Sequence, residues 1–203
     1  MSEAYIPLAL IVLSIIVAGI VQRVARSKRL AAEEEAAVRH GFVRVDPVAY
    51  RIFGVALARP ERSYEKGSMR VDRVRMDERT NRNPLESVGF KLKTEPYEVS
   101  FPDELGFPNA MFARGFPMVK LGAVRIIPDR FPELKNVKID TGDYQGVADR
   151  LTPSAVAFLA DFPKGIERVW IHDSRISFLV RAADFDALTT LFPMVESAYR
   201  SFS

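Results

Sequence analysis

The sequence of 203 residues contains no cysteine and only two histidines, His40 and His172. The absence of cysteine excludes disulfide bonds and a lipid-modified cysteine anchor, and it fits a reducing compartment without requiring one. A zinc site would need both histidines together with carboxylates, and neither histidine has a second one at ligand spacing. The sequence therefore predicts no metal site.

The sequence also lacks the glycine-rich loops that bind phosphates, since neither Gly-x-x-x-x-Gly-Lys nor Gly-x-Gly-x-x-Gly occurs. The sequence pI of 9.2 comes from a net charge of +3. All of this excess lies in residues 1–29, because residues 30–203 contain 25 basic and 25 acidic side chains. A nucleic-acid-binding domain would carry a basic stripe of its own. We therefore expect neither nucleic acid nor a cofactor.

No charged residue occurs between Ala4 and Gln22, a run of 19 residues. At about 1.5 Å per residue, a helix of this length spans the ~30 Å hydrocarbon core of a bilayer. Four basic residues follow at once: Arg23, Arg26, Lys28 and Arg29. A cleaved signal peptide would instead carry its basic residues before the apolar run. The pattern predicts an uncleaved transmembrane anchor.

The same basic cluster predicts the orientation of the anchor. Lys and Arg next to a span tend to remain in the cytoplasm. We therefore expect a single-pass protein of the inner membrane, with its N-terminus outside and its C-terminal domain cytoplasmic. We also expect Arg23, Arg26, Lys28 and Arg29 to contact anionic lipid headgroups.

One side of the expected span carries small residues, namely Ser14, Ala18 and Ala25. Small residues at helical spacing allow two helix backbones to approach closely in lipid. This face is the predicted binding site for larger integral-membrane subunits. The competing interpretation is that small residues occur there by chance.

The sequence divides into three parts. Residues 1–25 are the expected anchor, and residues 26–40 form a juxtamembrane helical stalk that includes Glu33–Glu35 and ends at Gly41. A solvated charged linker is the alternative for this stalk. Residues 41–203 are the expected cytoplasmic domain.

The pattern of the domain predicts an α+β fold with a mainly antiparallel sheet and helices on one face. Alternating residues predict a hairpin between Val88–Leu92 and Tyr97–Phe101, and a phase change predicts a bulge at Asp72-Arg73. A second hairpin is expected from Val169 to Val180, with its turn at Asp173-Ser174.

Two helices are expected in the C-terminal third. The first is capped by Thr152 and covers Pro153–Asp161. The second is capped by Asp184, continues to about Arg200, and is kinked or divided by Pro193.

Two short motifs suggest chemistry but lack the residues that would complete it. Asp140-Thr141-Gly142 matches the aspartic-protease triplet, yet a charged Asp143 follows it, so a strand end is the better interpretation. Ser63-Tyr64-Glu65-Lys66 has Ser-x-x-Lys spacing but lies between Pro60 and Gly67, which predicts a loop.

The histidines and the single tryptophan have structural interpretations. His40 is expected to end the stalk and His172 to face solvent at a hairpin tip. Trp170 alternates out of phase with its neighbours, so we expect it on the second face of the sheet, in packing or at an interface. No catalytic residue is predicted.

The chain resembles a group of uncharacterised single-span membrane proteins of actinobacteria. The resemblance lies in Arg39-His40-Gly41-Phe42 after the basic stop, and in the stretch Asp140–Val180 with its Asp149-Arg150-Leu151-Thr152-Pro153 segment. Some small proteins of this kind are accessory subunits of the cytochrome bc–cytochrome oxidase supercomplex. The resemblance implies such a role, and it transfers no haem, copper or quinone ligand.

The expected function is therefore that of a non-catalytic accessory subunit of an inner-membrane complex, such as a respiratory supercomplex. The alternative is a membrane-tethered cytoplasmic enzyme or ligand-binding sensor. A deep polar cleft with perturbed titratable groups would favour the alternative.

Overall fold

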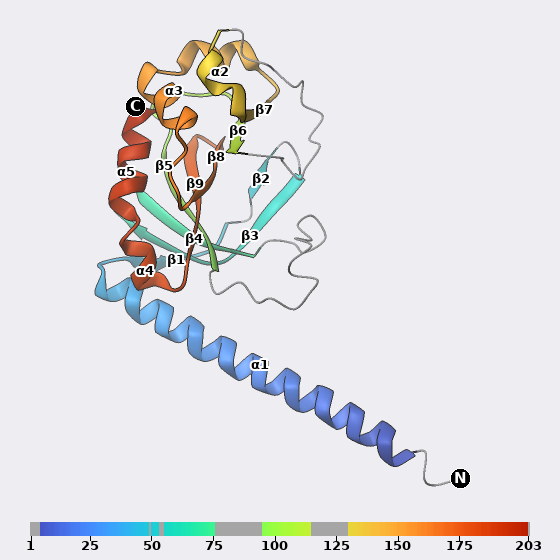
Figure 1. Ribbon diagram of the computed structural model, residues 1–203. Coiled ribbons are helices and arrows are strands. Elements are labelled where there is room, and N and C mark those ends of the chain that lie inside the picture. Colours follow the sequence, from blue (N-terminus) through green and yellow to red (C-terminus); the bar gives the residue numbers. More distant parts are fainter. Residues whose placement is uncertain (1–4, 49, 53–54, 76–94, 115–129, 203) are drawn as a thin grey trace.

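A computed structural model describes residues 5–48, 50–52, 55–75, 95–114 and 130–202 of the chain. It consists of an α+β domain and a long N-terminal helix that projects from one end of the domain (Figure 1). This helix, α1 (Tyr5–Arg39), runs without interruption through the expected anchor and stalk. None of the helices within these residues has the length and apolar character needed to cross a membrane.

The strands form one antiparallel sheet in the order β1-β3-β4-β5-β9-β8-β6-β7, and β2 pairs with β3 outside this order. Every pair is antiparallel. The prediction of an α+β domain with an antiparallel sheet is therefore confirmed. The strands are β1 (Val43–Val45), β2 (Tyr50–Ile52), β3 (Val55–Lys66), β4 (Met69–Arg75), β5 (Glu95–Pro102), β6 (Ala110–Arg114), β7 (Val137–Thr141), β8 (Ile166–His172) and β9 (Arg175–Ala182).

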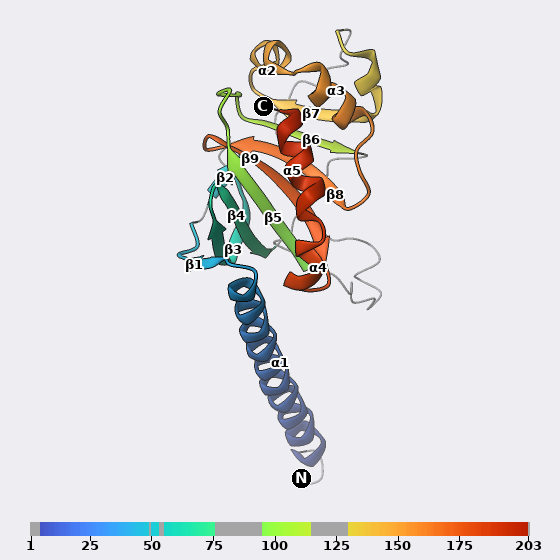
Figure 2. The ribbon, with the colours of Figure 1, turned by 90° about the vertical axis from the view of Figure 1, so that its left-hand side faces the viewer.

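Helices cover one face of this sheet, where α5 lies across the central strands (Figure 2). Alternate strand residues such as Val71, Val99 and Phe178 face this layer, and each is 0% exposed. The helical elements are η2 (Pro132–Asn136), α2 (Tyr144–Arg150), α3 (Pro153–Ala160), α4 (Phe185–Thr189) and α5 (Phe192–Ser201).

The C-terminal third follows the sequence prediction closely. The side chain of Thr152 caps α3, and that of Asp184 caps α4. Pro193 lies in the first turn of α5, so the expected last helix is divided into two. The hairpin of β8 and β9 turns at Asp173 and Ser174, whose positive φ values of 48° and 56° suit a two-residue turn.

One local prediction was wrong, and another lies outside the described residues. Asp72 and Arg73 pair in continuous register with Ser63 and Arg62, and the bulge lies on β3 between Pro60 and Arg62. Both faces of β4 are buried, so its apolar residues need no change of phase. The hairpin strand predicted at 88–92 lies outside the described residues.

Two motif predictions also need correction. The segment Ser63–Lys66 is the end of β3 and not a loop. Because side chains alternate along a strand, Ser63 and Lys66 point to opposite faces, which excludes a Ser–Lys catalytic pair. His172 is 4% exposed and does not face solvent, because its side chain lies on the covered second face of the sheet.

Candidate interaction site on helix α1

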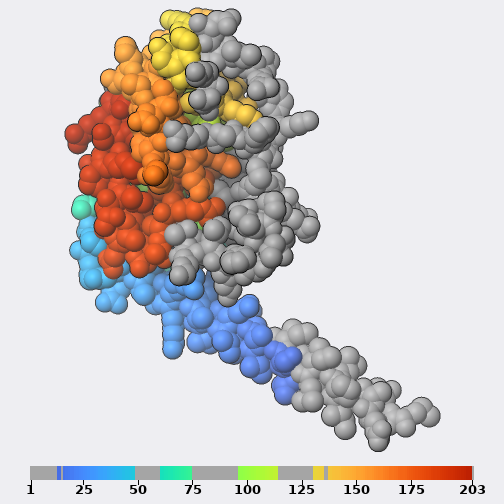
Figure 3. All heavy atoms as spheres, viewed as in Figure 1, coloured from blue at the N-terminus to red at the C-terminus, as the bar shows by residue number. Residues whose placement is uncertain are grey.

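Among the described residues, most of the exposed large apolar side chains lie on α1 between residues 13 and 24, here called the apolar segment. Its large side chains are 49% to 60% exposed: Leu13, Ile16, Val17, Ile20, Val21 and Val24. Figure 3 shows that α1 stands clear of the domain over this stretch. A soluble domain rarely exposes so much contiguous apolar surface, and such a patch typically marks a protein or membrane contact.

The predicted small-residue face is part of this segment. Ser14, Ala18 and Ala25 are all exposed on α1. At about 100° per residue, the three positions fall within about 40° of one another around the helix axis. They therefore form one continuous strip, and its use as a partner-binding face stays a prediction.

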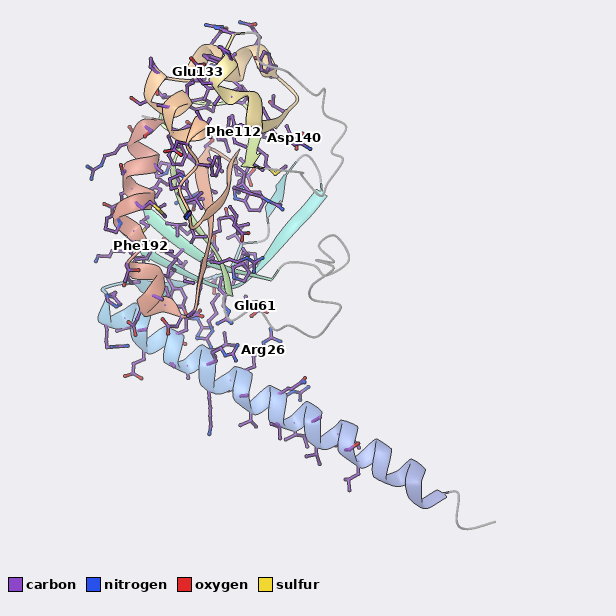
Figure 4. The ribbon with its side chains drawn as sticks, in the orientation of Figure 1. Arg26, Glu61, Phe112, Glu133, Asp140 and Phe192 are labelled. Carbon is purple, nitrogen blue, oxygen red and sulfur yellow. The ribbon has the colours of Figure 1, made fainter. Side chains whose placement is uncertain are left out.

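The four basic residues do not share one environment. Arg23, Lys28 and Arg29 are exposed, whereas Arg26 forms an ion pair with Glu61 of β3 (Figure 4). Arg26 therefore links α1 to the domain, although 52% of its side chain remains exposed. Its predicted contact with lipid headgroups would compete with Glu61.

The C-terminal part of α1 is docked on the sheet through a buried carboxylate, Glu33. Only 3% of its side chain is exposed, and it forms an ion pair with Arg73 of β4. Two tyrosine hydroxyls donate to the same carboxylate, Tyr64 at 3.2 Å and Tyr97 at 3.0 Å. We call these four residues the Glu33 cluster. These three donors offset the free-energy cost of removing the charge of Glu33 from water.

A second carboxylate, Glu34, reinforces the docking nearer the surface. It pairs with Arg62 of β3 and with Arg44 of β1, the latter at 3.3 Å. Arg62 also donates to the carbonyl of Leu30 at 3.1 Å. Although burial opposes the shift, hydrogen bonds from the two arginines hold the pKa of Glu34 below its usual value.

The C-terminal end of α1 is held by residues of β3 and α4. Gly41 ends the helix with a φ of +80°, and Lys66 donates to the carbonyl of His40 at 2.9 Å. His40 and Arg39 reach Asp186 of α4 at 2.8 and 3.1 Å. The hydrogen bond from His40 is the main cause of the lowered pKa of Asp186. α1 ends at Arg39, so His40 directly follows its last residue, where the sequence predicted the helix to end.

Sequence reasoning found the surface of α1 but missed its docking residues. The sequence predicts Glu33, like Glu34 and Glu35, as part of a charged stalk. Arg73 shares the strand phase of Val71, which indicates a buried arginine that needs a counter-charge, but the sequence does not indicate which carboxylate supplies it.

The second face of the sheet contains a buried polar cluster that bears on the enzyme alternative. His172 Nε2 lies 3.1 Å from Glu98 Oε1 and 3.2 Å from Ser177 Oγ. In a Ser-His-acid triad the serine and the acid contact different ring nitrogens. Here Glu98 and Ser177 share Nε2, and the acid beside Nδ1 is Asp173, whose Oδ2 lies 3.5 Å away, at the limit of a hydrogen bond. Because Ser177 is 0% exposed, its hydroxyl is not accessible to a substrate.

The titration of this cluster is consistent with a structural ion pair. Burial acts to lower the pKa of His172, but the hydrogen bond and charge of Glu98 raise it overall. Burial raises the pKa of the neighbouring Asp72, and hydrogen bonds from Ser63 and Arg70 offset this only in part. Trp170 is on the same face and 1% exposed, as its phase predicted.

The remaining motif residues have local structural roles. Asp140 is near the end of β7 (Figure 4), and burial raises the pKa of its carboxyl. The carboxylate of Asp143 caps α2 by accepting from the amide of Gly146 at 2.9 Å. Within the described ranges, no group of three or more His, Asp or Glu side chains is placed to hold a metal ion.

No protein-family model matches the chain, and no curated protein matches it. Among solved structures, the chain is similar to the mycobacterial trehalose monomycolate transport factor A, TtfA. The TM-score is 0.50 at 9% sequence identity, and the match covers 84% of this chain and 88% of that chain. At this identity the likeness concerns the fold alone.

Proposed function

We propose that this chain is a non-catalytic accessory subunit of an inner-membrane protein complex. The N-terminal part of α1 lies in the bilayer, with the N-terminus outside and the α+β domain in the cytoplasm. The observation that carries this proposal is the apolar segment of α1, whose large side chains are about half exposed. An apolar environment of lipid and partner helices would remove this surface from water.

The docking of α1 supports an accessory role over a loosely tethered one. Buried and surface ion pairs join the helix to β1, β3, β4 and α4. A membrane helix fixed in this way transmits a defined orientation to the domain. A subunit that braces or caps larger subunits needs such a fixed orientation, whereas a tethered enzyme does not.

Two kinds of complex are candidates for the partner. The sequence resemblance favours a respiratory supercomplex, and it is based on the anchor and roughly the last third of the domain. The fold likeness to a transport factor extends over 84% of the chain and favours a membrane transport complex. We favour the transport complex because that likeness involves the architecture of nearly the whole chain.

Purification of the tagged full-length chain in a mild detergent, followed by mass spectrometry, tests the proposal. We expect larger integral-membrane subunits to co-purify. A transporter would support the favoured complex, and haem-containing cytochrome subunits would support the respiratory one. Recovery of a free monomer under gentle conditions would contradict the accessory role itself.

A further inference from the structure

A pocket of about 490 Å³ opens where the end of α1, the β3–β4 turn and α5 meet. Its floor is aromatic. The rings of Phe101 and Tyr199 are stacked with centroids 4.5 Å apart, and Phe42 and Phe192 lie 5.5 Å apart. The hydroxyl of Tyr199 donates to the carbonyl of Pro102 at 2.9 Å, which fixes one wall of the pocket.

The rim of this pocket is charged. Lys66 lies over the ring of Phe42, with its Nζ 5.7 Å from the centroid. Arg200, whose side chain is 78% exposed, is 3.8 Å from the carboxylate of Glu196. Two cations and one carboxylate therefore surround an aromatic floor, and the rim carries a net positive charge.

We infer that this pocket binds an apolar side chain of an acidic peptide segment, supplied by the cytoplasmic part of the membrane subunit. The identity of that subunit depends on the proposed function. The aromatic floor would accept a large side chain such as tryptophan, and the cationic rim would favour acidic residues on either side.

The shape of the pocket favours a peptide over a small molecule. Small-molecule sites typically bury 70–90% of their ligand. This pocket opens to solvent at its rim, which suits an inserted side chain more than a small molecule that must be enclosed. A peptide inserts one side chain and gains further contacts along the rim.

Distance favours a peptide over a bilayer lipid. From Arg23, where the apolar run ends, to Arg39 the helix rises by about 24 Å. Phe42 and the pocket lie beyond that point. Headgroups of the bilayer would not reach them, whereas an extended segment of about seven to eight residues would.

The test is a titration of the purified full-length chain, labelled with ¹³C at its methionine methyl groups. Met69 lines the pocket and serves as the reporter. The probe is a short peptide with one tryptophan between glutamates. We expect a saturable shift of the Met69 signal, and we expect no such shift with matched peptides in which lysine replaces glutamate or serine replaces tryptophan.

Two substitutions at the rim should act in opposite directions. Arg200→Glu should weaken binding about fivefold, and Glu196→Gln should strengthen it about twofold, as is usual for exposed charges. Arg130→Glu, a charge reversal at an exposed site that does not line the pocket, should leave binding unchanged.

Several results would overturn the inference. These are the absence of saturation at millimolar peptide, equal binding of the lysine peptide, and insensitivity to Arg200→Glu. Tighter binding of decanoate than of the peptide would assign the pocket to a small carboxylate instead. This titration uses no membrane partner, so its failure would not change the co-purification result. A failed co-purification would likewise not change the result of the titration.

Discussion

At the scale of single residues, Glu33 joins α1 to the sheet through a buried cluster. Its carboxylate lies 3.0 and 3.2 Å from two tyrosine hydroxyls and pairs with Arg73, whose side chain is 8% exposed. Removing one partner of such a pair leaves the other charge buried. That loss costs more than the pair itself contributes to stability.

We therefore predict that Glu33→Ala lowers the free energy of unfolding by about 3–5 kcal/mol. Thermal and denaturant unfolding of the purified chain would measure the change. Glu35→Ala is the matched control, since Glu35 is an exposed glutamate on the same helix. Equal effects of the two substitutions would show that Glu33 contributes no more than a surface charge.

A pH dependence is expected from His172. Because its pKa is raised above the ordinary 6.5, the folded state binds the proton more tightly than the unfolded state does. This contribution to stability is complete below about pH 6.5 and is lost as the pH rises through the folded-state pKa.

Melting temperatures between pH 6 and 9, read from the fluorescence of Trp170, would measure this dependence. The ring of Trp170 has its centroid 6.4 Å from that of His172, so it reports on the same site. His172→Gln should remove the fall in stability over this interval. A variant that keeps the full slope would assign it to other groups.

At the scale of elements, the strip of small residues on α1 is the feature to test. Ala18→Leu should weaken association with the membrane partner about tenfold, or ~1.4 kcal/mol, because the helix backbones can no longer approach closely. Ile20→Phe adds bulk on the other side of the helix, about 200° away, and should have little effect. Co-purification yields of the two variants give the comparison.

Unchanged co-purification of Ala18→Leu would remove helix packing from the proposed mode of binding. The domain should stay folded in both variants. Its melting temperature provides the control, because positions 18 and 20 are exposed and remote from the Glu33 cluster.

The hairpin of β8 and β9 and the helices α3, α4 and α5 could be predicted because local signals determine them. The caps of Thr152 and Asp184, the proline at 193 and the turn at Asp173-Ser174 each act within a few residues. β4 was harder to predict because both of its faces are buried. On such a strand, Asp72 and Arg73 resemble a break in the pattern until their partners on other elements are known.

The docking of α1 could not be predicted either, because its partners also lie on distant elements. Glu33 is 31 residues from Tyr64 and 64 residues from Tyr97, and nothing near it in the sequence indicates burial. The sequence predicts an exposed His172 because hairpin tips usually face solvent. Its neighbour across the sheet, Glu98, is 74 residues away.

At the scale of the whole molecule, the orientation in the membrane can be tested directly, because the natural chain has no cysteine. Single cysteines can be introduced as Ser2→Cys and Ser197→Cys. In intact cells from which any outer membrane has been removed, a membrane-impermeant maleimide should label the first. It should label the second only after permeabilisation.

The opposite labelling pattern would contradict a cytoplasmic domain. Loss of the Ser2→Cys label together with a shortened protein would indicate a cleaved N-terminus instead of an anchor. Both outcomes would also remove the basis for a cytoplasmic peptide partner at the pocket beside α5.

The attachment of α1 to α4 also bears on how the chain is made. Asp186 follows Arg39 and His40 by 147 and 146 residues. Translation proceeds at about 5–20 residues per second, so α1 leaves the ribosome many seconds before this acceptor exists. During that interval neither the complete sheet nor α4 has formed. Their partners on α1, which are Glu33, Arg39 and His40, therefore remain without them. A nascent chain stalled before Asp186 would carry its N-terminal helix on an unfinished domain, open to chaperones and proteases at that end.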